Sequence, residues 1–260
     1  AIHQDGNYRP YSYGKSEPAG LGGDPELAYG LELCMRGYAV ICPDRLPYES
    51  RSLARSPFAE QFGSFRIRLF GGPEDTELTE DLYRGCVANR LLFEGWTPLG
   101  KELYEFTRAL DCLIAQPEVD AARLGVVGHS AGGLLAALAM FVDPRIGAGC
   151  SSCGTWLIRN AYRDDYLRPM QGFAGLLSVP GMRRWGDLDD VLAGLAPRPF
   201  LETNGDYGAD EIPEELIGKA RARYAELGIL ERYQYVPYDG GHVFRRDMRE
   251  RSYEWFDRWL

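Results

Sequence analysis

The segment from Gly128 to Gly132 (Gly-His-Ser-Ala-Gly) places a serine between small residues, directly after one apolar run and directly before another. Small neighbours allow the serine to occupy a sharp turn between a strand and a helix, which presents its hydroxyl at the edge of a sheet. Backbone N–H groups at the start of the following helix point at any negative charge that develops beside this hydroxyl. The pattern predicts that Ser130 is a nucleophile.

A serine hydroxyl is a weak nucleophile at neutral pH, so it needs a base within hydrogen-bond reach and an acid that orients the base. The chain has three histidines. His242 follows two glycines and lies downstream of Ser130, after the last predicted strand, and we predict that it is the base. His129 directly precedes the nucleophile, so its side chain should point away from the serine and pack or hydrogen-bond locally. His3 follows a short first strand.

The acid is expected in residues 204–213, which follow a predicted strand. Two aspartates in this stretch compete for the role. Asp210 precedes Glu-Ile-Pro and resembles a turn that often carries the acid, whereas Asp206 comes one residue after the glycine that ends the strand. We favour Asp210 and keep Asp206 as the alternative. The other aspartate would be a turn residue that accepts hydrogen bonds from backbone N–H groups.

An oxyanion hole needs two preorganised N–H donors. The backbone amide of Ala131, directly after the nucleophile, is the first candidate. The second should come from the loop at residues 3–6, where we favour the amide of Asp5 over that of Gln4. The acidic side chain of Asp5 must then point away from the anion or be paired.

Strands and helices alternate along the chain, which is typical of a mostly parallel sheet with helices on both faces. We expect one α/β domain over residues 1–260, with an irregular surface excursion over 43–97. The predicted strands cover residues 38–42, 123–128, 146–153, 199–205 and 233–236. The predicted helices cover residues 25–36, 99–116, 134–141, 214–227 and 246–260.

A second excursion, over about residues 155–195, is rich in aromatic residues and has no clean periodicity. An insertion at the carboxyl end of a central strand is a usual place for a substrate-covering lid, although a helical excursion that packs on the domain fits equally well. Trp156, in this stretch, and Trp96 are candidate pocket residues. Each could equally belong to the core. The sole role of Trp96 could be to anchor the helix that follows it.

The net charge of -9 argues against nucleic acid or an anionic membrane as a partner, because both favour a basic surface. No apolar run reaches the roughly 18 residues of a membrane span. The six cysteines lie mostly in apolar patterns, which predicts buried free thiols and a cytoplasmic protein. The pair Cys150 and Cys153 is a weak zinc signal, so we expect no metal site. The first residue is alanine rather than methionine, so we expect a segment upstream.

With these features the chain resembles the α/β-hydrolase superfamily, and within it the acetyl xylan esterase and dienelactone hydrolase-like group. The resemblance implies serine esterase chemistry without a cofactor, with Ser130 as nucleophile, His242 as base and an aspartate after the 199–205 strand as acid. Gln4 departs from the glycine common in the family, the acid loop is longer than usual, and two upstream strands are missing. The stretches that carry the likeness are residues 3–6, 36–44, 111–120, 128–133, 196–200 and 240–242.

The sequence therefore predicts a hydrolase of small carboxylic esters that works through an acyl-enzyme. An acyltransferase, a lactonase or a C–C hydrolase would use the same triad, because the fold does not fix the acceptor. A peptidase would usually bring a substrate-gating domain, for which these 260 residues leave no room. A noncatalytic binding protein on this fold would be expected to lose a triad member. Both a monomer and a homodimer fit the sequence.

Overall fold

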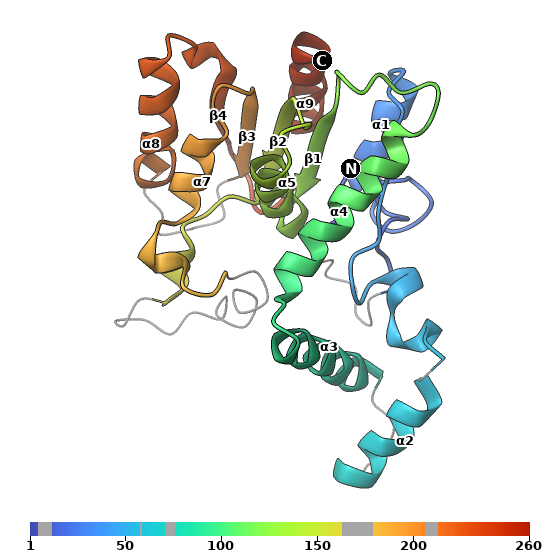
Figure 1. Cartoon of the computed structure of the whole chain (residues 1–260). Coiled ribbons are helices and arrows are strands. Elements are labelled where there is room, and N and C mark those ends of the chain that lie inside the picture. Colours follow the sequence, from blue (N-terminus) through green and yellow to red (C-terminus); the bar gives the residue numbers. More distant parts are fainter. Residues whose placement is uncertain (5–11, 58, 71–75, 163–178, 206–212) are drawn as a thin grey trace.

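The computed structural model describes the chain except for residues 5–11, 58, 71–75, 163–178 and 206–212. Within the described residues, one parallel sheet has the strand order β1-β2-β3-β4 (Figure 1). Beyond β1, Ile2 forms a single parallel bridge with Gly128. Because the strands run in the same direction, their carboxyl ends meet at one edge of the sheet, where ligands usually bind in such folds. The strands are β1 (Gly125–His129), β2 (Ala148–Ser152), β3 (Phe200–Gly205) and β4 (Tyr233–Tyr238).

Helices cover both faces of this sheet. On one face, an apolar cluster joins the sheet to α4 (Pro98–Ile114), α5 (Ala131–Val142), α7 (Leu188–Gly194) and α8 (Pro213–Glu226). On the other face, a second cluster joins it to α1 (Tyr29–Met35) and α9 (Arg246–Trp259). The parallel α/β architecture predicted from the alternation of elements is confirmed. Short 3₁₀ turns occupy Pro25–Leu27, Glu49–Arg51, Leu53–Arg55, Ile158–Tyr162, Met182–Arg184 and Leu230–Arg232.

Helix α5, which follows the nucleophile candidate, is the centre of the fold. Its first ten residues, from Ala131 to Met140, are all buried. A helix that is apolar all round is stable only where protein covers every side, and here α4, α7 and the sheet supply that cover. The helix start that faces the predicted site is therefore held rigidly.

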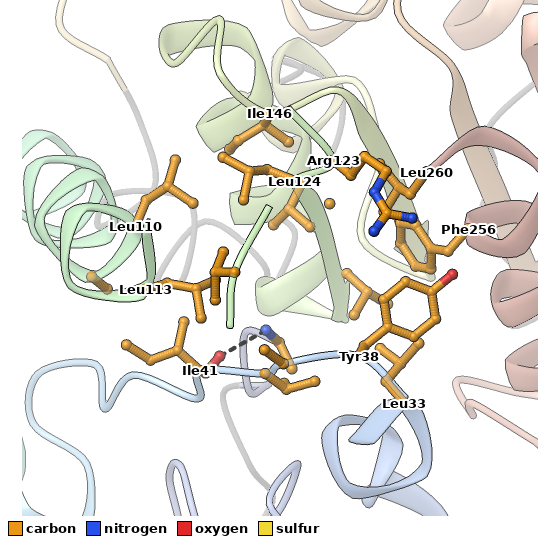
Figure 2. Close-up of a pocket in the computed structure, with 18 of the residues that line it drawn as sticks. Leu33, Tyr38, Ile41, Leu110, Leu113, Arg123, Leu124, Ile146, Phe256 and Leu260 are labelled. Atoms are coloured by element: carbon orange, nitrogen blue, oxygen red, sulfur yellow. Dashed lines mark hydrogen bonds between the residues drawn. The ribbon is translucent and has the colours of Figure 1, made fainter. Parts of the chain in front are cut away.

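The prediction of a strand over residues 38–42 is wrong. This segment carries no regular secondary structure, and a cavity of about 420 Å³ separates it from β1 (Figure 2). The carbonyl of Ile41 accepts a hydrogen bond from the Ala1 ammonium at 3.0 Å. An apolar run such as Tyr-Ala-Val-Ile-Cys forms a strand only where it pairs with a neighbouring strand, and among the described residues it pairs with none. Ser130 and His242 do not line the cavity.

The span 43–97 is also more regular than predicted. It contains α2 (Ala59–Phe70) and α3 (Thr76–Phe93), which lie together at one end of the molecule, where α3 meets α4 (Figure 1). Gly95, with φ of 84°, ends α3, and the amide of Trp96 donates back to the carbonyl of Leu91 at 2.8 Å. A helix that ends on a left-handed glycine in this way is stabilised by its own C-cap. Thr97 then caps α4 by accepting from the Gly100 amide at 2.9 Å.

Both described ends of the 155–195 excursion pack on the domain. Leu157 and Ile158 near its start, and Met182 near its end, are buried in the same cluster as α5. Asp187 caps α7 and also accepts from the amide of Ile158 at 2.9 Å, which ties the two ends together. These ends match a packed excursion, and the lid remains a prediction because residues 163–178 lie outside the described part.

The expectation of buried cysteines is only partly correct. All six are free thiols, but only Cys150 and Cys153 are buried. The remaining four lie at exposed or half-buried positions on α1, α3, α4 and the 38–42 segment: Cys34, Cys42, Cys86 and Cys112. A cysteine in an amphipathic helix pattern can stand on either side of the apolar stripe, so the pattern alone did not settle its burial.

Candidate active site

Ser130 lies at the sharp turn between β1 and α5, with φ of 55° and ψ of -125°. Its amide donates to the carbonyl of Ser152 in β2 at 2.8 Å, which fixes the turn against the sheet. The flanking glycines are required by close backbone contacts. A Cβ on Gly128 would lie 2.1 Å from the carbonyl oxygen of Gly132, and a Cβ on Gly132 would lie 2.2 Å from that of Ile2. The turn therefore depends on the absence of side chains on both sides of the serine.

His242 reaches Ser130 from the loop after β4. Its Nε2 lies 2.7 Å from the Ser130 Oγ, although 112 positions separate the two residues in the chain. Gly240, with φ of 103°, makes the turn that leads into this loop. Burial lowers the pKa of His242 below its ordinary value of 6.5. The imidazole is therefore neutral at pH 7 and is able to accept the serine proton.

His129 lies beneath the His242 ring. Its Nδ1 is 3.1 Å from the Ser152 Oγ, so the side chain bonds locally, as the sequence predicts. Its ring centroid lies 4.9 Å from that of His242 and 5.7 Å from that of Phe244, on which it stacks. Burial, followed by the proximity of His242, lowers the pKa of His129 to about 3. His129 is therefore an uncharged aromatic support for His242 at neutral pH, a contact that sequence reasoning did not find.

The candidate acids and one candidate oxyanion donor, namely Asp210, Asp206 and Asp5, lie outside the described residues. The element that leads to the acids does approach the base. Gly205, the last residue of β3, packs so closely on the histidine loop that a Cβ there would lie 2.1 Å from the carbonyl oxygen of Gly241. The stretch that holds both aspartates thus begins directly beside the loop of His242.

The first oxyanion candidate, Ala131, is the first residue of α5. At this position a backbone N–H has no acceptor inside the helix, so it is available to a ligand. The carbonyl groups of Ile2 and His3 lie against Gly132 one residue later, which brings the start of the 3–6 loop to the same helix end. The start of the 3–6 loop therefore lies beside the helix end that carries Ala131, and the assignment of the two donors stays a prediction.

A buried network holds the start of that loop. His3 is 1% exposed, and its Nδ1 lies 2.7 Å from the carbonyl oxygen of Gln4. The Arg45 amide donates to the His3 Nε2 at 3.0 Å, so the Nδ1 carries the proton and donates to Gln4. The Arg45 guanidinium in turn pairs with Glu102 on α4 at 3.2 Å. Sequence reasoning missed this link because Arg45 stands 42 positions from His3 and follows no motif.

The two candidate pocket tryptophans lie on different elements. Trp96 is half exposed at the start of α4, where its ring meets Tyr104 edge-on at 6.1 Å. Trp156 is partly buried and packs against the cluster around α5. For both, the described contacts are with structural neighbours rather than with Ser130 or His242.

No group of three or more His, Cys, Asp and Glu side chains in the described residues could hold a metal ion. In the same part of the chain, no helix is both long and apolar enough to cross a bilayer. The two thiols of the Cys150–Cys153 pair have different partners. The Cys150 Sγ contacts the Ser252 Oγ on α9 at 3.1 Å, whereas Cys153 contacts the loops at the carboxyl edge of the sheet.

Comparison with solved structures places this architecture among known folds. A candidate acetyl xylan esterase from Bacteroides fragilis NCTC 9343 superposes with a TM-score of 0.65 at 20% identity, over 88% of this chain and 56% of that one. A glucuronoyl esterase from Solibacter usitatus superposes with a TM-score of 0.52 at 20% identity, over 62% and 48% of the two chains. Residues 95–171 match the prolyl oligopeptidase family model. These likenesses show that the chain has the α/β-hydrolase fold.

Among curated proteins, this chain is 26% identical over 185 residues to the candidate hydrolase YtaP of Bacillus subtilis (strain 168). The match covers 67% of this chain and 58% of YtaP, so the chain spans little more than half the length of that relative. The 95–171 segment runs from α4 to the end of β2 and beyond, and it contains Ser130 but not His242. The relatives are hydrolases and esterases by name, which fits the chemistry of the serine–histidine pair.

Proposed function

We propose that this α/β-hydrolase cleaves carboxylic esters of small molecules through an acyl-enzyme formed on Ser130. The observation that carries the proposal is the 2.7 Å contact between the Ser130 Oγ and the His242 Nε2 at the strained turn between β1 and α5. A hydroxyl in contact with a neutral imidazole, beside the N-terminus of a buried helix, has the parts that nucleophilic acyl transfer requires.

In the first half of the reaction, His242 takes the proton from Ser130 as its oxygen attacks the ester carbonyl carbon. The carbonyl oxygen becomes an oxyanion, which the N–H groups of Ala131 and Asp5 stabilise. The tetrahedral intermediate collapses, and the leaving alcohol receives the proton from His242. Water then attacks the acyl group with His242 again as base, which releases the carboxylic acid and regenerates the serine. The reaction uses no cofactor.

Asp210 accepts the hydrogen bond from the Nδ1 of His242 in this proposal, with Asp206 as the alternative. A carboxylate there fixes the imidazole tautomer and stabilises the imidazolium that forms. The close packing of Gly205 on Gly241 supports either choice, because the chain leaves that contact directly into the stretch with both aspartates.

We propose that the alcohol or acyl pocket lies near Ser130, that Trp156 and Trp96 contribute to it, and that the 155–195 excursion covers it as a lid, all within one domain that spans residues 1–260. Two observations support this arrangement. The excursion leaves from the carboxyl end of β2, next to Ser130, and both apolar clusters share one sheet.

The prolyl oligopeptidase match makes peptide hydrolysis the second candidate function. The matched segment carries the nucleophile elements α4, β1, α5 and β2, which esterases and peptidases of this fold share. It therefore supports a serine hydrolase without separating esters from amides, and a direct assay must do so.

The test uses the full chain with short p-nitrophenyl esters, a peptide p-nitroanilide and an organophosphonate. We expect ester turnover and a phosphonate adduct located on Ser130 by mass spectrometry of the digested protein. Ser130→Ala should remove the adduct and lower kcat on the order of 10⁶-fold. Heat-denatured protein controls for nonspecific labelling. A folded chain that neither turns over esters nor takes the label would refute the proposal, and turnover confined to the anilide would favour the peptidase.

A further inference from the structure

The loop that carries the base and the strand that leads to the candidate acids meet at one packed contact, which we term the junction. It consists of Cys153, Gly205 and residues 240–243. A Cβ on Gly205 would lie 2.1 Å from the carbonyl oxygen of Gly241 and 2.6 Å from that of Gly240. The histidine loop therefore rests directly on the end of β3, at the residue that precedes Asp206.

The Cys153 thiol joins the two sides of the junction. Its Sγ accepts from the Gly205 amide at 3.3 Å and donates to the carbonyl of Val243 at 3.5 Å. Gly205 immediately precedes Asp206, the first of the two candidate acids, and Val243 immediately follows His242. The Cys153 amide also donates to the carbonyl of Thr203 at 2.9 Å, which extends the contact between β2 and β3 by one residue.

The chemistry of the sulfur suits this double contact. Only the protonated thiol can donate to one backbone group while it accepts from another. Burial raises the pKa of Cys153 and so keeps the thiol protonated at neutral pH. The residue also has φ of 49°, a conformation that favours glycine over cysteine. A strained backbone persists only where its surroundings hold it, and such strain concentrates at functional sites.

We propose that Cys153 and Gly205 are positioning residues for the triad: they hold the acid stretch and the His242 loop in one fixed arrangement. This inference rests on the proposed function. Neither residue contacts the ester or the reacting atoms. Their loss should let the acid drift from His242, which slows the chemical step while ester binding persists. With less contact from the carboxylate, the imidazolium form of His242 should also be less stable.

The test compares Cys153→Ala, Cys153→Gly and Cys153→Ser with the wild type in the ester assay. We expect the alanine variant to lose about 10- to 100-fold in kcat with little change in KM, since small displacements of catalytic groups cost rates of this order. The acidic limb of its kcat/KM profile should move to lower pH. The glycine variant relieves the strained φ, so it should be no less stable than the alanine variant and equally slow. The serine variant keeps a donor and an acceptor and should recover most of the rate.

Cys150→Ala is the matched control, because it removes another buried thiol from β2, the strand that ends directly before Cys153. Its sulfur contacts Ser252 on α9 rather than either loop, so we expect a lower melting temperature with unchanged kcat and pH profile. The inference is wrong if the alanine and glycine variants of Cys153 keep wild-type kcat and pH dependence, or if Cys150→Ala slows the enzyme as much. If the alanine variant does not fold, the glycine and serine variants decide the matter. A wild type without turnover or label would instead refute the proposed function itself.

Discussion

Gly132→Ala should slow catalysis although alanine is the better helix former. Inside a helix, alanine is favoured over glycine by about 1 kcal/mol. At this position, however, the added Cβ would lie 2.2 Å from the carbonyl oxygen of Ile2 and 2.7 Å from that of His3. An ordinary contact needs about 3.5 Å, so residues 2–3 must retreat by about 1 Å from the start of α5.

That retreat would carry the 3–6 loop, and with it the proposed Asp5 donor, away from the oxyanion. A misplacement of about 1 Å can cost on the order of 10²-fold in rate, and loss of one oxyanion donor costs about 10²- to 10³-fold in kcat. We therefore expect Gly132→Ala to lower kcat by about 10²-fold with a small change in KM, measured by steady-state hydrolysis of a p-nitrophenyl ester.

Gly218→Ala supplies the matched control for this prediction. Gly218 lies inside α8, and a Cβ added there would meet no other segment within 4 Å, so the substitution should raise stability slightly and leave kcat unchanged. Circular dichroism establishes that both variants are folded. A folded Gly132→Ala protein with wild-type kcat would show that the approach of residues 2–3 to α5 does not position the oxyanion donor.

Two further predictions concern the base and the acid. Burial lowers the pKa of His242, and only the neutral imidazole accepts a proton. We therefore expect kcat/KM for ester hydrolysis to rise with pH through a midpoint below 6.5 and to stay level above it. A midpoint above 6.5 would contradict the assignment of His242 as the base. Asp210→Asn should lower kcat by about 10⁴-fold whereas Asp206→Asn should not. The opposite ranking of the two variants would make Asp206 the acid.

The local patterns in the sequence were sufficient to predict the strand and the helix on either side of the nucleophile. An apolar strand, a glycine-flanked serine and an apolar helix follow one another within residues 123–141, and each is stabilised mainly by its own burial. The same reasoning failed for residues 38–42, because an apolar run becomes a strand only when a partner backbone lies beside it. It also missed α2 and α3, whose apolar residues do not follow a clear helical period and whose surroundings contain many glycines and prolines.

Contacts between distant segments account for what the sequence left open. The hydrogen bond from the Arg45 amide to His3 and the tilted ring contact between His129 and His242 both join residues that no local pattern relates. The choice between Asp206 and Asp210 is of the same kind, since it depends on the path of a loop rather than on residue type. The burial of these residues and the charges around them depend on segments that are distant in the sequence, so a linear motif does not contain this information.

Glycines mark the points where this assembled backbone is tightest. At Gly128, Gly132, Gly154 and Gly205, a Cβ would lie between 2.1 and 2.4 Å from a backbone atom of another segment or of the following turn. Gly85 and other glycines far from the site have open space there. The serine motif contains only the first two of these close contacts, whereas the other two lie at the ends of β2 and β3. These four glycines let the backbones of Ile2, the serine turn, β2, β3 and the histidine loop pack at one place. Main-chain packing therefore sets the geometry of the serine–histidine pair.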